Sequence, residues 1–84
     1  MYSERFQRNV WITNHARLMM EERSVSESLL VDLLETGTIR EKTTSDLWIY
    51  KAYPERPDNL VCTAVVKGQA IIVKTVMINW RLEE

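Results

Sequence analysis

His15, the single histidine of this 84-residue chain, lies eight residues before Arg23 in a segment of good helix formers. Side chains at this spacing, about two turns apart, share one side of the helix that we expect over residues 15–23. An imidazole can exchange a proton near neutral pH, and a guanidinium can hold a phosphate oxygen. His15 and Arg23 are therefore the candidate catalytic residues, with the imidazole as general acid or base beside a phosphate that the guanidinium holds. The alternatives are that His15 caps or packs the helix, and that Arg23 pairs with Glu27.

Three other residues are candidates for binding. Lys74 interrupts an apolar strand and could reach a phosphate or a carboxylate, or it could discourage strand aggregation. Arg56 and Tyr53 belong to a loop with two prolines, and loops carry function disproportionately. The aromatic residues could stack on bases or instead fill a core or an oligomer interface. They are Trp48, Tyr50, Tyr53 and Trp80.

Two helices are expected to position His15 and Arg23. Thr13 or Asn14 can cap the first helix, and its expected core side consists of Ala16, Met19, Met20 and Arg23. Ser24 or Ser26 can cap the second helix, with Ser24 and Glu27 matching a capping box. A leucine stripe forms its apolar side, and Gly37 is expected to end it in the left-handed conformation.

After Gly37 the hydrophobic period changes from that of helices to that of strands. We expect strands over residues 47–53, 60–66 and 70–80, with a hairpin turn at residues 67–69, and a short edge strand over residues 9–12. The predicted fold is α+β, with two N-terminal helices packed on an antiparallel sheet of three or four strands. The chain is expected to form a single domain over residues 1–84. It divides into a disordered tail (1–8), a strand and helical hairpin (9–37) and a β-meander (38–84).

Composition excludes several classes of function. Eleven basic and twelve acidic residues give a net charge of −1, which disfavours a general DNA binder held by bulk charge. One cysteine cannot form an internal disulfide, and the Cys and His count is too low for a structural zinc site, so we expect no metal and no cofactor. No apolar run is long enough for a membrane span, and the first residues lack the apolar core of a signal peptide. The single cysteine favours a reducing compartment, so the expected location is the cytoplasm.

The segment from Thr13 to Ser26 resembles the opening of a bacterial domain family of unknown function, with the pattern T-x-H-A-x-x-R-M-x-x-R-G-I-S. The matching residues are Thr13, His15, Ala16, Met20, Arg23 and Ser26, with Val25 for isoleucine. Gly37 fits the helix end, residues 73–76 fit the closing strand, and Met19 replaces the first arginine of the pattern. The order of elements is similar to ribonuclease toxins of the RelE and colicin type, which implies an RNA-directed activity.

Two hypotheses follow. The first is a non-catalytic module that binds a protein partner or self-associates, since three tryptophans in a small domain suit a buried interface. The alternative is a toxin-like domain that binds or cleaves RNA with His15 and Arg23.

Overall fold

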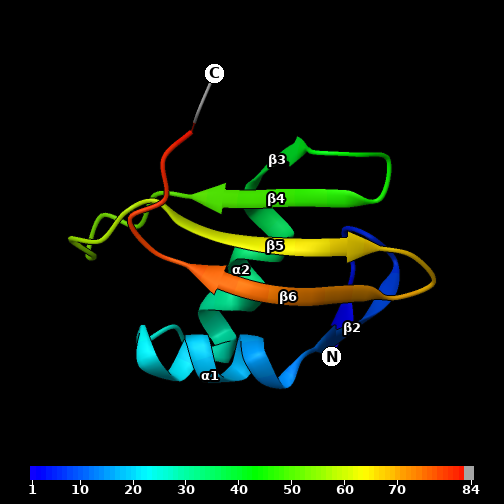
Figure 1. Ribbon diagram of the computed structural model, residues 1–84, viewed down its shortest axis with the longest axis horizontal. Coiled ribbons are helices and arrows are strands. Elements are labelled where there is room, and N and C mark those ends of the chain that lie inside the picture. The colour runs from blue at the N-terminus through cyan, green and yellow to red at the C-terminus, as the bar shows by residue number, and fades with distance from the viewer. Residues whose placement is uncertain (83–84) are drawn as a thin grey trace.

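Two helices and six strands form the chain, and the computed structural model describes residues 1–82. The elements are β1 (Tyr2–Ser3), β2 (Arg8–Ile12), α1 (Asn14–Glu22), α2 (Glu27–Thr36), β3 (Thr38–Glu41), β4 (Asp46–Lys51), β5 (Val61–Lys67) and β6 (Ile71–Met77). One sheet contains all six strands in the order β1-β2-β6-β5-β4-β3 (Figure 1). The α+β class and the two helices are confirmed. The prediction of three or four antiparallel strands is wrong, because the sheet has six strands and β2 pairs with β6 in parallel.

Thr13 fixes the start of α1 and attaches it to the sheet. Its hydroxyl oxygen accepts a hydrogen bond from the Ala16 amide at 3.0 Å, which caps the helix. The same hydroxyl donates to the Val73 carbonyl of β6 at 3.0 Å. Ala16 and Met20 are buried, so the predicted core side of α1 faces inward.

Ser26 caps α2, accepting from the Leu29 amide at 3.1 Å. The predicted capping box of Ser24 with Glu27 is wrong. Ser24 has φ 53 and lies in the left-handed turn between the helices, two residues before the cap. The leucine stripe of α2 is buried as predicted, with Leu30, Leu33 and Leu34 in the core.

Gly37 ends α2, but for a different reason from the one predicted. Its φ is −68, so it does not adopt the left-handed conformation. A Cβ at this position would lie 2.6 Å from the Leu33 carbonyl oxygen and 2.7 Å from Ile49 Cγ2. Glycine is required because the helix end approaches β4 this closely.

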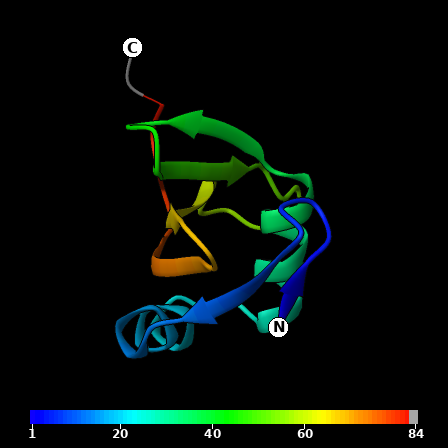
Figure 2. The same ribbon diagram turned by 90° about the vertical axis from the view of Figure 1, so that its right-hand side faces the viewer.

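The two helices leave one face of the sheet uncovered. α2 lies behind the strands in Figure 1, and Figure 2 shows it on one side of the sheet. α1 lies alongside β6, continuing the sheet layer where β2 ends. The core therefore lies between α2 and the inward face of the strands, with Val10, Ile49, Val61, Val65, Ile71, Val73 and Val76 buried.

Two short strands and the position of β2 differ from the sequence prediction. β1 and β3 were not predicted, because two to four residues are too few to show an alternating pattern. β2 was expected at the edge, but β1 covers its outer side. Within residues 1–8, where a disordered tail was expected, the Arg5 guanidinium donates to the Leu34 and Gly37 carbonyls at the end of α2.

Candidate nucleic-acid interface

Strand alternation and register determine which residues lie on the uncovered face of the sheet. Residues that pair directly across neighbouring strands point to the same face. This rule places three rows of side chains there, which we call the open face. The rows are Arg40, Trp48, Ala64 and Thr75; Thr38, Tyr50, Cys62 and Met77; and Asp46, Val66, Ile72 and Trp11.

Three aromatic rings cluster at one end of the open face. Trp80 stacks on Tyr50 with 5.1 Å between ring centroids, and it meets Trp48 edge-on at 5.6 Å. Trp80 follows β6 and is held there by its backbone, which exchanges hydrogen bonds with Leu60. Asn79, with φ 52, supplies the left-handed turn that brings the chain to this point. Partly exposed aromatic rings of this kind offer stacking surfaces for planar ligands.

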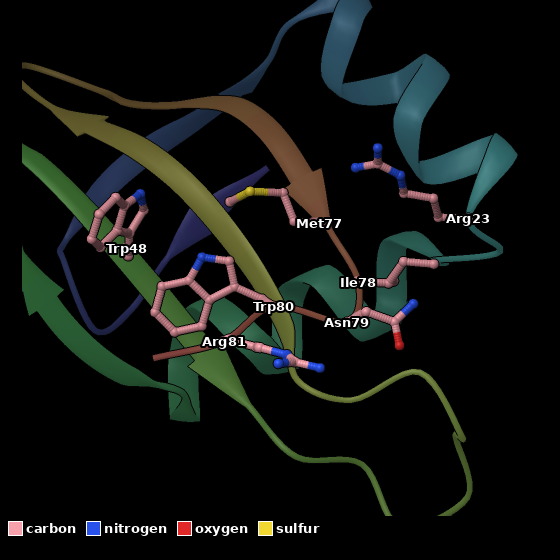
Figure 3. A pocket seen from close by; sticks show the side chains of 7 residues that line it. All are labelled: Arg23, Trp48, Met77, Ile78, Asn79, Trp80 and Arg81. Atoms are coloured by element: carbon pink, nitrogen blue, oxygen red, sulfur yellow. The ribbon is translucent and has the colours of Figure 1, made fainter. Parts of the chain in front are cut away.

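A hollow of about 750 Å³ opens beside this cluster. Figure 3 shows the Trp48 and Trp80 rings near Met77, with the Arg23 side chain approaching from the end of α1. The lining residues are Arg23, Trp48, Met77, Ile78, Asn79, Trp80 and Arg81. The volume falls within the range of about 300–1,000 Å³ typical of small-molecule sites.

Basic side chains surround the aromatic cluster. The Lys42 ammonium lies 5.7 Å from the centre of the Trp48 ring, a cation–π contact. Lys42 and Lys74 line a second, smaller hollow together with Trp48 and Asp46. Lys74 lies on the same face as Ile72, two residues earlier in β6, and it is the extra residue of a β-bulge that brings Thr75 to this face as well. Ala64 pairs with Thr75, whereas Val65 pairs with Val73.

The acidic residues are concentrated elsewhere. Residues 14–36, which contain both helices, carry five acidic side chains and only two arginines. Asp32, on α2, forms an ion pair with Lys51 at 2.9 Å, and Asp58 pairs with Arg56 at 2.8 Å. The charges are therefore unevenly distributed although the net charge is close to zero. The open face is basic and aromatic, and the side formed by the helices is more acidic.

His15 lies at the margin of the open face, at the first turn of α1. It is exposed, and its Nε2 atom is 3.4 Å from the Thr75 hydroxyl. It does not line the larger hollow, so the structure separates it from Arg23. An exposed imidazole beside a hydroxyl is able to take part in proton transfer with a bound ligand.

Arg23 does line the hollow, and its guanidinium also donates to the Val76 carbonyl on the edge of β6. No ion pair with Glu27 is present among residues 1–82. The contact to Val76 fixes the position of the guanidinium and leaves further N–H groups on the same fork.

Arg56 is occupied by contacts within the chain. Its guanidinium holds Asp58 with two hydrogen bonds of 2.8 Å, and it donates to the Arg23 and Ser24 carbonyls at 2.8 Å each. These carbonyls lie at the C-terminal end of α1, where a cation is favourable. Arg56 thus joins the proline loop to the junction between the helices.

Tyr53 is buried and lies apart from the other aromatic residues of the predicted group. Its hydroxyl donates to Asp32 Oδ2 at 2.6 Å, and Lys51 donates to the same oxygen at 2.9 Å. These bonds, that from Tyr53 first, hold the pKa of Asp32 below its usual range. Burial, followed by the bond to Asp32, raises the pKa of Tyr53 above its usual value.

Cys62 is fully buried, and burial raises the pKa of its thiol to about 12. It is therefore a thiol rather than a nucleophilic thiolate at neutral pH.

Local sequence patterns predict part of the open face but not all of it. Trp48 and Tyr50 are two apart in a strand, which predicts a shared face, and Trp80 was grouped with them. Lys42 and Arg81 were missed, since no local pattern brings the turn after β3 and the segment after β6 to neighbouring parts of one face. Lys74 lies on this face, whereas Arg56 and Tyr53 lie among contacts of the loop and α2.

Among residues 1–82, no helix is long and apolar enough to cross a membrane.

Comparison with known proteins gives a family and no activity. No match was found among curated proteins or among solved structures. The model of the family described as a domain of unknown function, DUF4258, matches residues 12–78. This match covers both helices and β3 to β6, most of the chain, and so the chain belongs to the DUF4258 family.

Proposed function

We propose that the chain binds single-stranded RNA on the open face of the sheet. The observation that carries this proposal is the Trp48, Tyr50 and Trp80 cluster with the Lys42 ammonium beside it. Proteins bind single strands by stacking bases on aromatic side chains while cations follow the phosphates. The open face offers both groups within one surface.

The electrostatic field of the open face supports an anionic ligand in spite of the net charge of the chain. Arg40 and Lys42 lie beside Trp48, and Lys74 lies on the neighbouring strand β6. Asp46 is the acidic member of the face, and its carboxylate accepts a hydrogen bond from Thr43 at 2.9 Å. A local excess of cations is sufficient to attract a phosphate chain, because the attraction between exposed charges extends over about a Debye length. This length is roughly 8–10 Å at physiological salt.

His15 extends the proposal to cleavage. It would take the proton of a ribose 2′-hydroxyl as that oxygen attacks the adjacent phosphorus. A 2′,3′-cyclic phosphate forms, the bond from phosphorus to the 5′-oxygen of the next nucleotide breaks, and that oxygen takes a proton from water. The Thr75 hydroxyl at 3.4 Å can orient the imidazole for this step. Arg23 would hold a phosphate farther along the strand rather than the one being cleaved.

Binding is tested by fluorescence anisotropy with a labelled single-stranded RNA at several salt concentrations. The double variant Lys42→Ala/Lys74→Ala should weaken binding, and it should reduce the slope of log K against log salt by about 1.4. The control Arg17→Ala/Lys67→Ala removes the same charge from two exposed residues that line neither of the two hollows described above. Equal losses from both double variants would overturn the proposal.

Cleavage is tested by incubating wild type and His15→Ala with total RNA. Loss of cleavage in the variant, with RNA affinity retained, supports His15 as the acid–base group. Cleavage that persists unchanged in His15→Ala would exclude that role, and binding without cleavage by the wild type would leave an RNA-binding domain.

A second candidate function is binding of a protein partner or self-association. Trp11 on β2 is 67% exposed, Tyr2 on β1 is 52% exposed and Leu18 on α1 is 50% exposed. Exposed large apolar side chains of this kind are typical of interfaces. Sedimentation of wild type and Trp11→Ser tests this candidate. A dimer lost in the variant supports it, and a monomer at all concentrations contradicts self-association.

A further inference from the structure

We infer that the larger hollow holds one unpaired nucleotide of an RNA chain, with the base stacked on Trp80 and the phosphate on Arg23 and Arg81. This inference rests on the proposed RNA function, and it assigns a position within the open face to one nucleotide.

The hollow has an aromatic wall and an apolar floor. Trp80 and Trp48 meet edge-on at 5.6 Å, so their rings present two differently oriented surfaces to a ligand, and Met77 lines the hollow beside them (Figure 3). Trp80 is supported from behind by Tyr50 and is fixed through its backbone to Leu60. A wall that is already ordered loses little conformational entropy when a base stacks on it.

The charge of the hollow selects an anion. The ionisable residues that line it within residues 1–82 are two arginines, Arg23 and Arg81, and no carboxylate. Arg23 is held by the Val76 carbonyl and enters from α1, whereas Arg81 enters from the segment after β6. Planar guanidinium groups from two elements can hold a phosphate in more than one direction.

Asn79 adds a group that can recognise the edge of a base. Its backbone is fixed by the left-handed conformation and by a 2.7 Å hydrogen bond from its amide to the Asp58 carbonyl. Its exposed side-chain amide at the rim of the hollow can both donate and accept hydrogen bonds. A ligand with a flat ring, a polar ring edge and a phosphate matches this combination, which is the chemistry of a nucleotide.

The test uses ¹⁵N-labelled protein titrated separately with adenosine monophosphate, adenosine and ribose 5-phosphate. Adenosine monophosphate should shift the Trp80 indole N–H and the Met77 and Asn79 amides. Adenosine and ribose 5-phosphate should each bind about fivefold to a hundredfold more weakly, since each lacks one of the two contacts. Equal shifts from all three compounds, or no shift at these residues, would overturn the inference.

Two variants localise the site. Trp80→Leu should lower the affinity for adenosine monophosphate by about fivefold to a hundredfold. Arg81→Ala should lower this affinity severalfold without changing the affinity for adenosine. Arg17→Ala is the matched control and should leave all three affinities unchanged. An effect of Arg17→Ala equal to that of Arg81→Ala would show that only bulk charge is sensed.

A single-stranded RNA added to the same labelled protein separates this inference from the proposed function. RNA binding that shifts Lys42 and Lys74 but leaves Trp80 and Asn79 unmoved overturns the nucleotide site and leaves the RNA function standing. Binding of the mononucleotide in the hollow without binding of the RNA overturns the RNA function and assigns the site to free nucleotides.

Discussion

Trp80 stacks on Tyr50 across the end of the sheet, with 5.1 Å between ring centroids and 28° between ring planes. The two residues are thirty positions apart in the chain and belong to different segments, the end of β4 and the turn after β6. Their contact ties the C-terminal segment to the open face. Any ligand that stacks on Trp80 therefore meets a ring that is already supported.

This contact can be measured by a double-mutant cycle with Tyr50→Leu and Trp80→Leu. The coupling free energy should be about 0.5–1.5 kcal/mol in favour of the pair, beyond the loss of buried area in each single variant. Urea unfolding gives the four free energies. The cycle of Trp80→Leu with Trp11→Leu is the control and should show no coupling, and coupling of equal size in both cycles would contradict a specific stack.

The close approach of α2 to β4 predicts a large effect of one methyl group. In Gly37→Ala the new Cβ would meet the Leu33 carbonyl oxygen at 2.6 Å and Ile49 at 2.7 Å, so the helix end must move away from the sheet. The free energy of unfolding should fall by about 1–3 kcal/mol. Gly68→Ala is the matched control, since the nearest atom to its Cβ would be 3.9 Å away. Equal thermal midpoints for the two variants would show that the approach is looser than described.

Local signals were sufficient to predict the helices but not the faces of the last strand. The caps and apolar periods of α1 and α2 are contained within a few residues, and both helices appear close to their expected bounds. Strict alternation over residues 70–80 places Lys74 and Val76 on one face. The bulge at Lys74 breaks that alternation, so Val76 is buried while Lys74 is exposed.

The candidate site was predictable only where its parts are neighbours in the chain. Trp48 and Tyr50 share a face by alternation. The arrival of Trp80, Arg81 and Arg23 beside them depends on the turn at Asn79 and on the placement of α1 along β6. The hydrogen bonds from Arg56 to the carbonyls at the end of α1 were equally unpredictable, because thirty-three positions separate Arg56 from Arg23.

The bonds between Tyr53 and Asp32 predict how stability depends on pH. The pKa of Asp32 is lowered in the folded chain, so its contribution is present above the unfolded value of about 4 and is lost as the pH falls through the folded value. The pKa of Tyr53 is raised, so its contribution is present below about pH 10 and is lost as the pH rises through the folded value.

Tyr53→Phe should therefore flatten the stability profile at both ends. Urea unfolding measured from about pH 2 to about pH 11 should show a shallower acid limb, because the largest cause of the low Asp32 pKa is removed, and a smaller alkaline loss. Tyr2→Phe, at an exposed tyrosine, is the control and should keep both limbs of the wild-type profile. An unchanged acid limb in Tyr53→Phe would mean that the other partners of Asp32, Lys51 first, hold its carboxylate without the tyrosine.

The Arg56 contacts predict a structural role that separates it from ligand binding. Arg56→Lys keeps the charge but removes the planar fork, so one ammonium cannot serve Asp58 and the Arg23 and Ser24 carbonyls together. Unsatisfied carbonyls at the end of α1 should lower the free energy of unfolding by about 1–3 kcal/mol. RNA affinity should stay at the wild-type value at a temperature where the variant is folded. Arg17→Lys, on the exposed side of α1, is the control and should change neither quantity. A loss of RNA affinity in folded Arg56→Lys would instead place Arg56 at the ligand.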